Sequence, residues 1–260
     1  MKIATWNVNS VKARLETVTG WLREAAPDVA VLQEIKCQDD AFPRQAFEDL
    51  GYNCAVHGQK TYNGVAVLSK RPIEDAVPRL AGGDGDDHAR YMEAVIAGET
   101  GAVRVASIYA PNGNPVGTDK FRYKLAWLER LRARAKTLLL DEEPFALMGD
   151  YNVIPTPDDV HDPKAWMGDA LFQPESRAAL RRIENLGLTD AFRACHAQTH
   201  QYTFWDYQAG AWQKDHGIRI DHILLSPQAA DRLKACGIDK HVRAWEKPSD
   251  HVPVWCELAI

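Results

Sequence analysis

Carboxylates, carboxamides, one phenol and one imidazole follow short apolar runs along this chain. They are carried by the stretches "TWNVN", "LQEIK", "IYAPN", "MGDYN", "RIDHILLS" and "PSDHVPV", and they are Asn7, Glu34, Tyr109, Asn112, Asp150, Asn152, Asp221, Asp250 and His251. A single Asn or Asp after a strand indicates a turn. Polar groups at the same ends of several strands describe the rim of an α/β active site.

The residue types in this set suit metal-assisted hydrolysis of a phosphate ester. Carboxylates are hard oxygen ligands, which favour Mg²⁺ or Mn²⁺ over zinc. Asn and Tyr side chains can donate hydrogen bonds to phosphate oxygens. No Ser or Cys stands beside a base in a nucleophile motif, and the five cysteines show neither CxxC nor zinc-like spacing. We interpret the cysteines as buried, reduced thiols of a cytoplasmic protein.

Asp-His occurs twice, and the two copies have different surroundings. In "IRIDHILLS" successive side chains of a strand alternate between faces, so Asp221 and His222 point in opposite directions. We expect His222 to be a structural histidine of the core. "PSDHVPV" is a proline-bounded loop entering a strand, where Asp250 and His251 can converge. We predict that the working pair is Asp221 with His251, one residue from each copy.

These residues require a scaffold of alternating strands and helices. Apolar runs of strand length occur at 2–8, 29–35, 64–70, 91–98, 103–110, 145–153, 203–207, 218–226 and 252–259. Helical spacing of apolar residues occurs at 11–25, 119–140, 174–194 and 227–235. Interleaved strands and helices predict an α/β fold with mixed sheets. With 260 residues, 45% of them hydrophobic, and no linker-like stretch, we expect a single domain over residues 1–260.

Composition narrows the choice of partner. The net charge of −5 argues mildly against a nucleic-acid partner. However, a negative net charge can hide a local basic patch, and an acidic metal site makes the net charge more negative. No apolar run approaches about 18 residues, which predicts no membrane span. Polar and basic side chains interrupt the first fifteen residues, which therefore do not resemble a signal peptide.

Six motifs in order, "TWNVNS", "LQEIK", "YAPNG", "GDYNVIP", "RIDHILLS" and "SDHVPV", resemble the exonuclease III family of AP endonucleases and 3′→5′ exonucleases. This family lies within the endonuclease/exonuclease/phosphatase superfamily, and the resemblance runs from Lys2 to about Leu258. It implies a four-layer α/β sandwich of two mixed β-sheets packed face to face and flanked by helices. It also implies a monomeric, Mg²⁺-dependent DNA repair nuclease, with Mn²⁺ as a possible substitute. Its substrates are duplex DNA with abasic sites, cleaved on the 5′ side, and 3′ ends, through 3′→5′ exonuclease and 3′-phosphatase activity.

The resemblance implies a role for each motif residue. Glu34 takes the position of the main metal ligand, with Asn7 and Asp250 close by. Asn9 is neutral where some relatives carry an acid, which favours one metal over two.

The remaining motif residues surround the reacting phosphate in this reading. Asn152 and Tyr109 hold the phosphate, and Asp221 pairs with His251. Asp150 positions or activates the attacking water, or protonates the leaving group. A cationic His251 leaves Asp150 as the base, although the sequence leaves the choice between these two residues open.

The expected DNA interface combines an apolar pocket with cations. The resemblance implies that Phe204, Ile218 and Ile220 form a pocket for a flipped-out abasic sugar. Trp205 is expected in the core and Trp212 at the DNA surface. Candidate contacts to the DNA backbone, which could equally be a solvated face, are Arg90, Asn112, Lys120, Arg122 and Lys124. The stretch 156–169 is too polar and irregular for a core element and is expected to be an insertion loop at the site that could face DNA.

Two other functions remain open. The same metal site could serve a phosphodiesterase or phosphatase acting on small molecules or lipids. A nonenzymatic DNA-binding or scaffold protein on this fold would be free to lose Glu34, Asp150 or His251, and all three are present.

Overall fold

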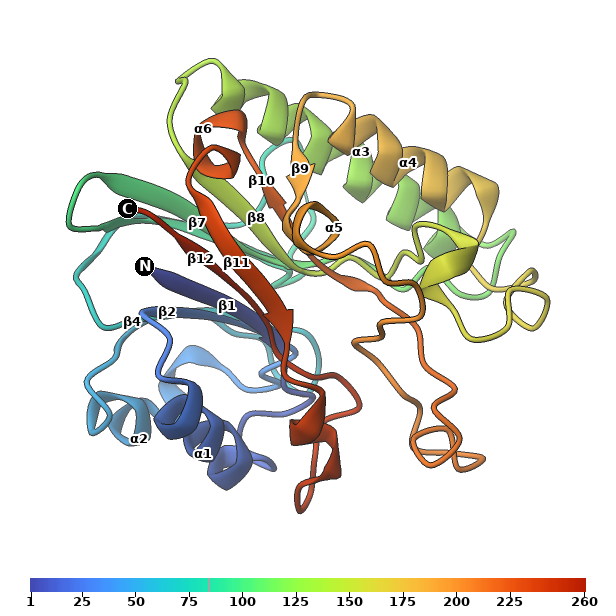
Figure 1. Cartoon of the computed structure of the whole chain (residues 1–260), viewed down its shortest axis with the longest axis horizontal. Coiled ribbons are helices and arrows are strands. Elements are labelled where there is room, and N and C mark those ends of the chain that lie inside the picture. Colours follow the sequence, from blue (N-terminus) through green and yellow to red (C-terminus); the bar gives the residue numbers. More distant parts are fainter. Residues whose placement is uncertain (84) are drawn as a thin grey trace.

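Two mixed six-stranded sheets packed face to face form the centre of the molecule (Figure 1). The computed structural model describes residues 1–83 and 85–260. The first sheet contains, in spatial order, β11 (Leu233–Ile238), β12 (Val254–Leu258), β1 (Lys2–Asn7), β2 (Val29–Gln33), β4 (Val65–Ser69) and β3 (Asn53–His57). The second contains β5 (Ile73–Pro78), β6 (Tyr91–Ala97), β7 (Ala102–Tyr109), β8 (Phe145–Asp150), β10 (Asp221–Leu225) and β9 (Thr189–Asp190).

Helices cover the outer face of each sheet. The α-helices are α1 (Leu15–Ala25), α2 (Arg44–Glu48), α3 (Asp119–Leu139), α4 (Pro174–Glu184), α5 (Ala191–Cys195) and α6 (Pro227–Ala230). Short 3₁₀ helices occupy Asp39–Ala41, Pro157–Asp159 and Lys240–Ala244. Figure 1 shows α1 and α2 outside the first sheet, and α3 and α4 outside the second. This arrangement confirms the predicted four-layer α/β sandwich.

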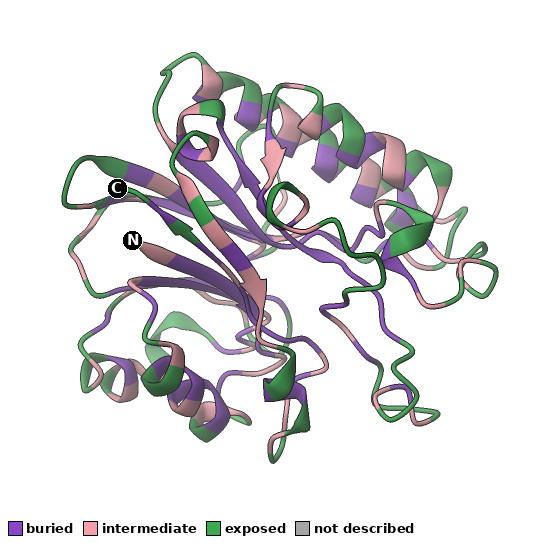
Figure 2. Cartoon of the chain, in the orientation of Figure 1, coloured by how far each residue is buried: buried purple, intermediate pink, exposed green. Residues whose placement is uncertain are grey.

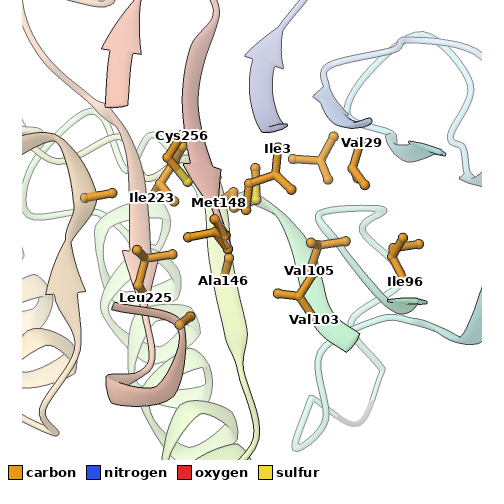
Figure 3. Close-up of a cluster of buried hydrophobic side chains, with 14 of the residues drawn as sticks. Ile3, Val29, Ile96, Val103, Val105, Ala146, Met148, Ile223, Leu225 and Cys256 are labelled. Carbon is orange, nitrogen blue, oxygen red and sulfur yellow. The ribbon is translucent and has the colours of Figure 1, made fainter. Parts of the chain in front are cut away.

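The main core lies between the two sheets (Figure 3). Ile3 and Val29 of the first sheet and Val105 and Met148 of the second belong to one buried cluster. The central strands are buried along most of their length, whereas the helices turn exposed faces outward (Figure 2). On α3 this amphipathic pattern follows from apolar residues at helical spacing, such as the buried Leu128 and Leu131.

Strand direction brings the candidate residues to one edge of the sandwich. β1 and β2 are parallel, so Asn7 lies opposite Gln33, directly before Glu34. β7 and β8 are also parallel, and Tyr109 lies opposite Asp150. β10 runs antiparallel to β8 and pairs Asp221 with Asp150. The carboxyl ends of the parallel strands and the beginning of β10 therefore share this edge.

Gly149 makes the close approach of β7 and β8 possible just before Asp150. Its φ is 152°, and a Cβ at this position would lie 1.9 Å from the carbonyl oxygen of Ile108. Only glycine fits such a contact, so this residue determines where the Asp150 side chain leaves the sheet.

Two predicted elements were wrong, because contacts with distant segments determine the backbone conformation at these positions. The stretch 203–207 is not a strand: Phe204 makes only isolated bridges to Ile218 and His251. The aromatic run has strand propensity, but it crosses between two loops. The predicted helix 227–235 stops at Ala230, and β11 follows because Leu233–Ile238 pair with β12.

Other differences concern element ends and short strands. The predicted helix 174–194 is divided into α4, β9 and α5. The predicted strand 218–226 begins only at Asp221. Four strands were missed, namely β3, β5, β9 and β11. These four strands form the sheet edges. An edge strand has a neighbouring strand on one side, and its apolar pattern is weaker than that of a central strand.

The described residues contain no helix that is both long and apolar enough to cross a membrane. All five cysteines are free. Cys37, Cys236 and Cys256 are buried as expected, whereas Cys195 is exposed. The prediction of buried thiols was therefore wrong for Cys195, which lies at the end of the short helix α5.

Candidate active site

A cavity of about 280 Å³ opens at the edge where the strand ends meet. One side of the cavity is polar and the other is apolar. The residues that line it are Glu34, Tyr109, Asn112, Asp150, Asn152, Trp166, Asp169, Leu171, Phe204, Asp206, Ile220, Asp250 and His251. The structure thus brings together most of the residues that the sequence singled out.

Asn7 joins the two sheets at the floor of the site. It is fully buried at the end of β1. Its Nδ2 donates to Glu34 Oε1 and to Asp150 Oδ2, both at 3.0 Å. One carboxamide therefore sets the relative position of a carboxylate from each sheet.

Asp221 and His251 form the pair that the sequence predicted. The distances from His251 Nδ1 to the Asp221 carboxylate oxygens are 2.9 and 3.1 Å. His251 Nε2 lies 3.8 Å from Asp150 Oδ2. The backbone of His251 is held as well, because Trp6 Nε1 donates to its carbonyl at 3.0 Å. The imidazole is therefore fixed between two buried carboxylates.

Burial and neighbouring charges give His251 and Asp150 unusual pKa values. Burial alone lowers the pKa of His251, but the charges of Asp221 and Asp150 and the hydrogen bond to Asp221 raise it to about 10. Burial raises the pKa of Asp150 to about 7, against the opposing effect of the His251 charge. At neutral pH the site therefore holds an imidazolium next to a carboxylate that can exchange a proton.

Asp150, Asp221 and His251 also satisfy a simple distance test for a metal site. Their potential ligand atoms lie within 4.8 Å of one another. An imidazolium has no free lone pair for a metal, because a metal-binding histidine must be neutral. This cluster is therefore suited to proton transfer rather than to metal binding.

Glu34 and Asp250 provide hard oxygen donors, which fit a divalent cation. Burial raises the pKa of Glu34, but the Lys36 charge and hydrogen bonds from Asn7 and Lys36 outweigh it, and the net pKa is lowered. Glu34 is therefore ionised, and both carboxylates line the cavity. The φ of Glu34 is 51°, a left-handed conformation rare for this residue type. Strain of this kind persists where the surroundings hold a side chain in a required position.

Asn152 and Asn112 lie together on one side of the cavity. Asn152 Nδ2 donates to the carbonyl of Ala110 at 2.9 Å, and its backbone amide donates to Asp150 Oδ1 at 2.9 Å. Asn112 Nδ2 lies 3.4 Å from Asn152 Oδ1. Two carboxamides are thus held near Asp150, and Asn112 is exposed to solvent.

Lys124 was wrongly expected to contact DNA. It is fully buried, and its Nζ donates to the backbone carbonyls of Asn112 and Asn152. Burial lowers the pKa of its ammonium group to about 7. Lys124 therefore connects α3 to the two loops that carry these asparagines.

The other expected DNA cations differ in their surroundings. Lys120 is exposed near the start of α3. Arg122 is exposed too and forms an ion pair with Asp119. Arg90 is half-buried with its guanidinium 4.7 Å from the centre of the Tyr109 ring. Arg90 therefore braces Tyr109, which lines the cavity.

The apolar side of the cavity corrects part of the predicted pocket. Phe204 and Ile220 line it as expected, and the Phe204 ring meets the His251 ring edge-on at 5.0 Å. Ile218 does not line the cavity, because it is fully buried in the cluster beneath. Trp166 and Leu171 complete this wall, and neither was named from the sequence.

The stretch 156–169 is a loop at the site, as predicted, because its Trp166 and Asp169 line the cavity. The prediction that it is too polar for the core was wrong for its first part. Asp159 is fully buried and accepts a hydrogen bond from Arg219 Nε at 2.7 Å. Val160 is also buried and bridges to Ile218. An ion pair thus anchors the first part of the loop, a feature that composition does not reveal.

The loop after Phe204 carries two tryptophans with different environments. Trp205 is fully buried, as predicted. Trp212 is half-buried, packs edge-on against Trp205 at 5.1 Å and does not line the cavity. Its expected contact with DNA remains a prediction.

Ser249 is a further residue of the site that the sequence did not assign a role. It is fully buried, and its Oγ donates to the carbonyl of Asn7 at 2.7 Å and accepts from the amide of His251 at 3.2 Å. Ser249 therefore ties the loop that carries His251 to the end of β1. The sequence signal that could have indicated this role is the position of Ser249 directly before Asp250 and His251 in "SDH".

Comparisons with known proteins bear on the fold and on the class of activity. The sequence profile of the Endonuclease/Exonuclease/phosphatase family matches residues 4–251. The chain is 34% identical to Exodeoxyribonuclease III of Haemophilus influenzae, over 99% of this chain and all of that protein. It is similar to the structure of an AP endonuclease from Archaeoglobus fulgidus, with 37% identity, full coverage of both chains and a TM-score of 0.94. It is also similar to the 3′ phosphatase NExo from Neisseria bound to a product DNA hairpin, with 38% identity, full coverage of both chains and a TM-score of 0.95.

Proposed function

The chain belongs to the Endonuclease/Exonuclease/phosphatase family and to its exonuclease III group of metal-dependent phosphodiester hydrolases, and we propose that it repairs DNA. In this proposal it cleaves the phosphodiester on the 5′ side of an abasic site in duplex DNA, and it removes nucleotides and phosphate from 3′ ends. One chain contributes the whole cavity, which supports action as a monomer. Free thiols support a reducing compartment such as the cytoplasm.

The observation that carries this proposal is the charge of the cavity. Five carboxylates line it, and among the described residues His251 is its one basic side chain. A phosphate entering such a site is repelled, since two like charges about 4 Å apart interact with about 4 kcal/mol near a protein surface. A divalent cation supplies the missing positive charge, which supports metal dependence.

Glu34 and Asp250, with Asn7 close by, are the residues we assign to Mg²⁺ or Mn²⁺. When bound, the metal supplies a Lewis acid and a template for the scissile phosphate. Asn9 contributes a neutral carboxamide that accepts from Lys36 Nζ at 2.6 Å. The ammonium of Lys36 also lies 2.8 Å from Glu34 Oε2. The Lys36 ammonium would repel a second cation beside Asn9 and Glu34, which supports a single metal.

Asp150 and His251 divide the proton chemistry between them. His251, kept cationic by Asp221, donates from Nε2 to a phosphate oxygen and stabilises its growing negative charge. Asp150 accepts the proton of the attacking water, because its raised pKa of about 7 makes it a better base than an ordinary carboxylate. We therefore assign the base to Asp150.

Tyr109 and Asn152 complete the set that holds the phosphate. Burial, followed by the nearby charge of Glu34, raises the pKa of Tyr109 well above its usual value. Its phenol therefore stays protonated and can donate to a phosphate oxygen. Asn152 and Asn112 offer carboxamides beside it.

The size of the rate enhancement explains why the parts must act together. Enzymes accelerate phosphate-ester hydrolysis by about 10¹⁷-fold or more. One general acid or base provides about 10²–10⁴-fold. His251 or Asp150 alone cannot account for the difference, so the metal and the fixed donors carry most of the remainder.

The experiment offers the purified chain a duplex with one abasic site and, separately, a simple aryl phosphodiester. We expect nicking on the 5′ side of the abasic site with Mg²⁺, and little hydrolysis of the small ester. Faster turnover of the small ester than of the duplex would instead support a phosphodiesterase acting on small molecules or lipids. Absence of nicking with both Mg²⁺ and Mn²⁺ would support a nonenzymatic DNA-binding protein.

A further inference from the structure

A layer of buried polar side chains lies between the apolar core and the candidate active site. The inner faces of the two sheets are apolar at Val31 of β2 and at Val105 of β7 (Figure 3). Because side chains on a strand alternate between faces, the next inward positions are Gln33 and Ser107. Both are fully buried, as is Thr5 of β1. Polar groups therefore interrupt the apolar packing just before the strands reach the cavity.

These side chains form a chain of hydrogen bonds that crosses from one sheet to the other. Thr5 Oγ1 donates to Gln33 Oε1 at 3.2 Å, and Gln33 Nε2 donates to Ser107 Oγ at 2.9 Å. Ser107 Oγ in turn donates to the carbonyl of Leu32 at 3.0 Å. β1 and β2 belong to the first sheet and β7 belongs to the second. Gln33 and Ser107 therefore connect the two sheets directly.

The connection lies immediately before residues of the site. Gln33 directly precedes Glu34, which lines the cavity. Ser107 is two residues before Tyr109, so both side chains point to the same face of β7. Tyr109 lies opposite Asp150 in the register of β7 and β8. The position of Glu34 relative to Asp150 therefore depends on how β2 is placed against β7.

A hydrogen bond restricts this placement more than apolar packing does. The hydrophobic effect has no directional preference. A hydrogen bond requires its donor and acceptor to lie about 2.7–3.2 Å apart and in good alignment. Loss of the partner is costly for a buried amide such as that of Gln33. The buried chain of hydrogen bonds therefore favours a single offset between the sheets.

We propose that Gln33 and Ser107 are positioning residues, which fix the offset of the two sheets and thereby the place of Glu34 relative to Asp150. This inference rests on the proposed function, because it concerns how the metal-binding and proton-transferring carboxylates of that site are aligned. Neither Gln33 nor Ser107 lines the cavity, so both act through their neighbours. A displacement of about 1 Å can lower a catalytic rate by about 10²-fold, so a small change of offset is sufficient.

The test removes the connection in three ways. Gln33→Met keeps the length of the side chain but removes both of its hydrogen bonds. Ser107→Ala leaves the Gln33 amide without this acceptor. The double variant Gln33→Met/Ser107→Ala makes both positions apolar. Because replacing both partners by apolar groups can be nearly neutral for stability, the double variant separates a loss of positioning from a loss of stability.

Three quantities are measured for each variant. They are the midpoint of urea unfolding, the dissociation constant of Mn²⁺ for the metal-free chain without DNA, followed by electron paramagnetic resonance, and kcat on an abasic duplex with Mg²⁺. In Gln33→Met and in the double variant we expect the Mn²⁺ dissociation constant to rise about tenfold and kcat to fall about 10- to 100-fold, as for residues that orient metal ligands from outside. In the double variant the urea midpoint should return toward the wild-type value while both defects remain.

Val31→Ala is the matched control. Val31 is fully buried on the same strand, two residues before Gln33, and belongs to the apolar core. Truncating it leaves a cavity and should lower the urea midpoint. The Mn²⁺ dissociation constant and kcat should keep their wild-type values, because the polar connection is intact. Equally weakened Mn²⁺ binding in this control would overturn the inference.

The remaining outcomes separate this inference from the proposed function. If the wild type binds Mn²⁺ but does not nick the abasic duplex, the proposed function fails, and the Mn²⁺ dissociation constants still decide the inference. If the wild type nicks the duplex and both Gln33→Met and the double variant keep its Mn²⁺ dissociation constant and kcat, the inference is wrong and the function stands. Recovery of both quantities together with stability in the double variant also overturns it, because the connection would then serve stability alone. If the wild type neither binds Mn²⁺ nor nicks the duplex, both proposals fail. If Gln33→Met does not fold, the double variant and Ser107→Ala decide.

Discussion

His222 and His251 each follow an aspartate in the sequence, yet their surroundings shift their pKa values in opposite directions. Burial and the nearby Arg219 lower the pKa of His222. His222 Nδ1 lies 3.1 Å from Arg219 Nη1, and Nε2 lies 3.1 Å from the carbonyl of Val153. His251 instead faces two carboxylates, which raise its pKa to about 10. Strand alternation was enough to predict this separation from the sequence, because Asp221 and His222 begin a regular strand.

Replacing Asp221 by Asn tests the pairing with His251. The variant keeps the shape of the side chain but removes the charge that holds His251 cationic. We expect kcat on an abasic duplex to fall by about 10²- to 10⁴-fold at neutral pH, because loss of an aspartate that orients a catalytic histidine can cost up to about 10⁴-fold. A variant with wild-type kcat at neutral pH would remove this pair from the mechanism.

The pH profile of the wild type follows from the same pKa values. We expect kcat to rise as pH increases through about 7, where Asp150 loses its proton, and to fall near pH 10, where His251 loses its own. In Asp221→Asn the alkaline limb should move toward neutral pH. A wild-type profile without an acid limb near pH 7 would argue against Asp150 as the base.

At the level of elements, long and regular patterns were readable from the sequence. The helix at 119–140 is observed as α3, and the central strands were all found, because they combine apolar runs with clear boundaries. Edge strands such as β3 and β5 were missed, since their residues are largely half-buried or exposed. The buried Asp159–Arg219 pair joins residues sixty positions apart, and no local pattern indicates such a contact.

The Asp159–Arg219 pair should stabilise the loop that carries Trp166. Arg219 and other partners outweigh the effect of burial and lower the pKa of Asp159 to about 2. A group whose pKa is depressed by folding contributes stability above its unfolded pKa and loses it as pH falls through the folded value. We expect Asp159→Asn to lower the free energy of unfolding by about 3 kcal/mol at pH 7. The difference from the wild type should shrink below about pH 4.

Urea unfolding at several pH values measures this effect. Asp158→Asn is the matched control, because Asp158 is the exposed neighbour of Asp159 and should stay within about 0.5 kcal/mol of the wild type. A stability difference for Asp159→Asn that is independent of pH would contradict the ionic interpretation.

Lys124 offers a second test at the level of elements. Lys124→Met keeps the length of the buried side chain but leaves the carbonyls of Asn112 and Asn152 without this donor. We expect a loss of about 1–3 kcal/mol in the free energy of unfolding, together with lower kcat, since both loops line the cavity. Thermal unfolding and abasic-site cleavage check the two effects, and wild-type values for both would show that Lys124 has no supporting role.

For the whole molecule, the balance of charge is the property that connects fold and function. The chain carries a net charge of −5, and its cavity is lined by carboxylates. The motifs alone predicted the fold family and most of the polar residues that line the cavity. They could not predict the size of the cavity or the place of Trp166, because both depend on how a loop is anchored by distant residues.

The most direct measurement is metal dependence of abasic-site cleavage by the EDTA-treated chain. Mg²⁺ is added back to the wild type and to Glu34→Gln, and the rate of cleavage is followed as a function of metal concentration. We expect no cleavage without metal, full recovery in the wild type, and recovery in Glu34→Gln only at Mg²⁺ concentrations about 10- to 100-fold higher. Cleavage by the metal-free wild type at an undiminished rate would contradict the assignment of this carboxylate-lined cavity to a metal-dependent nuclease.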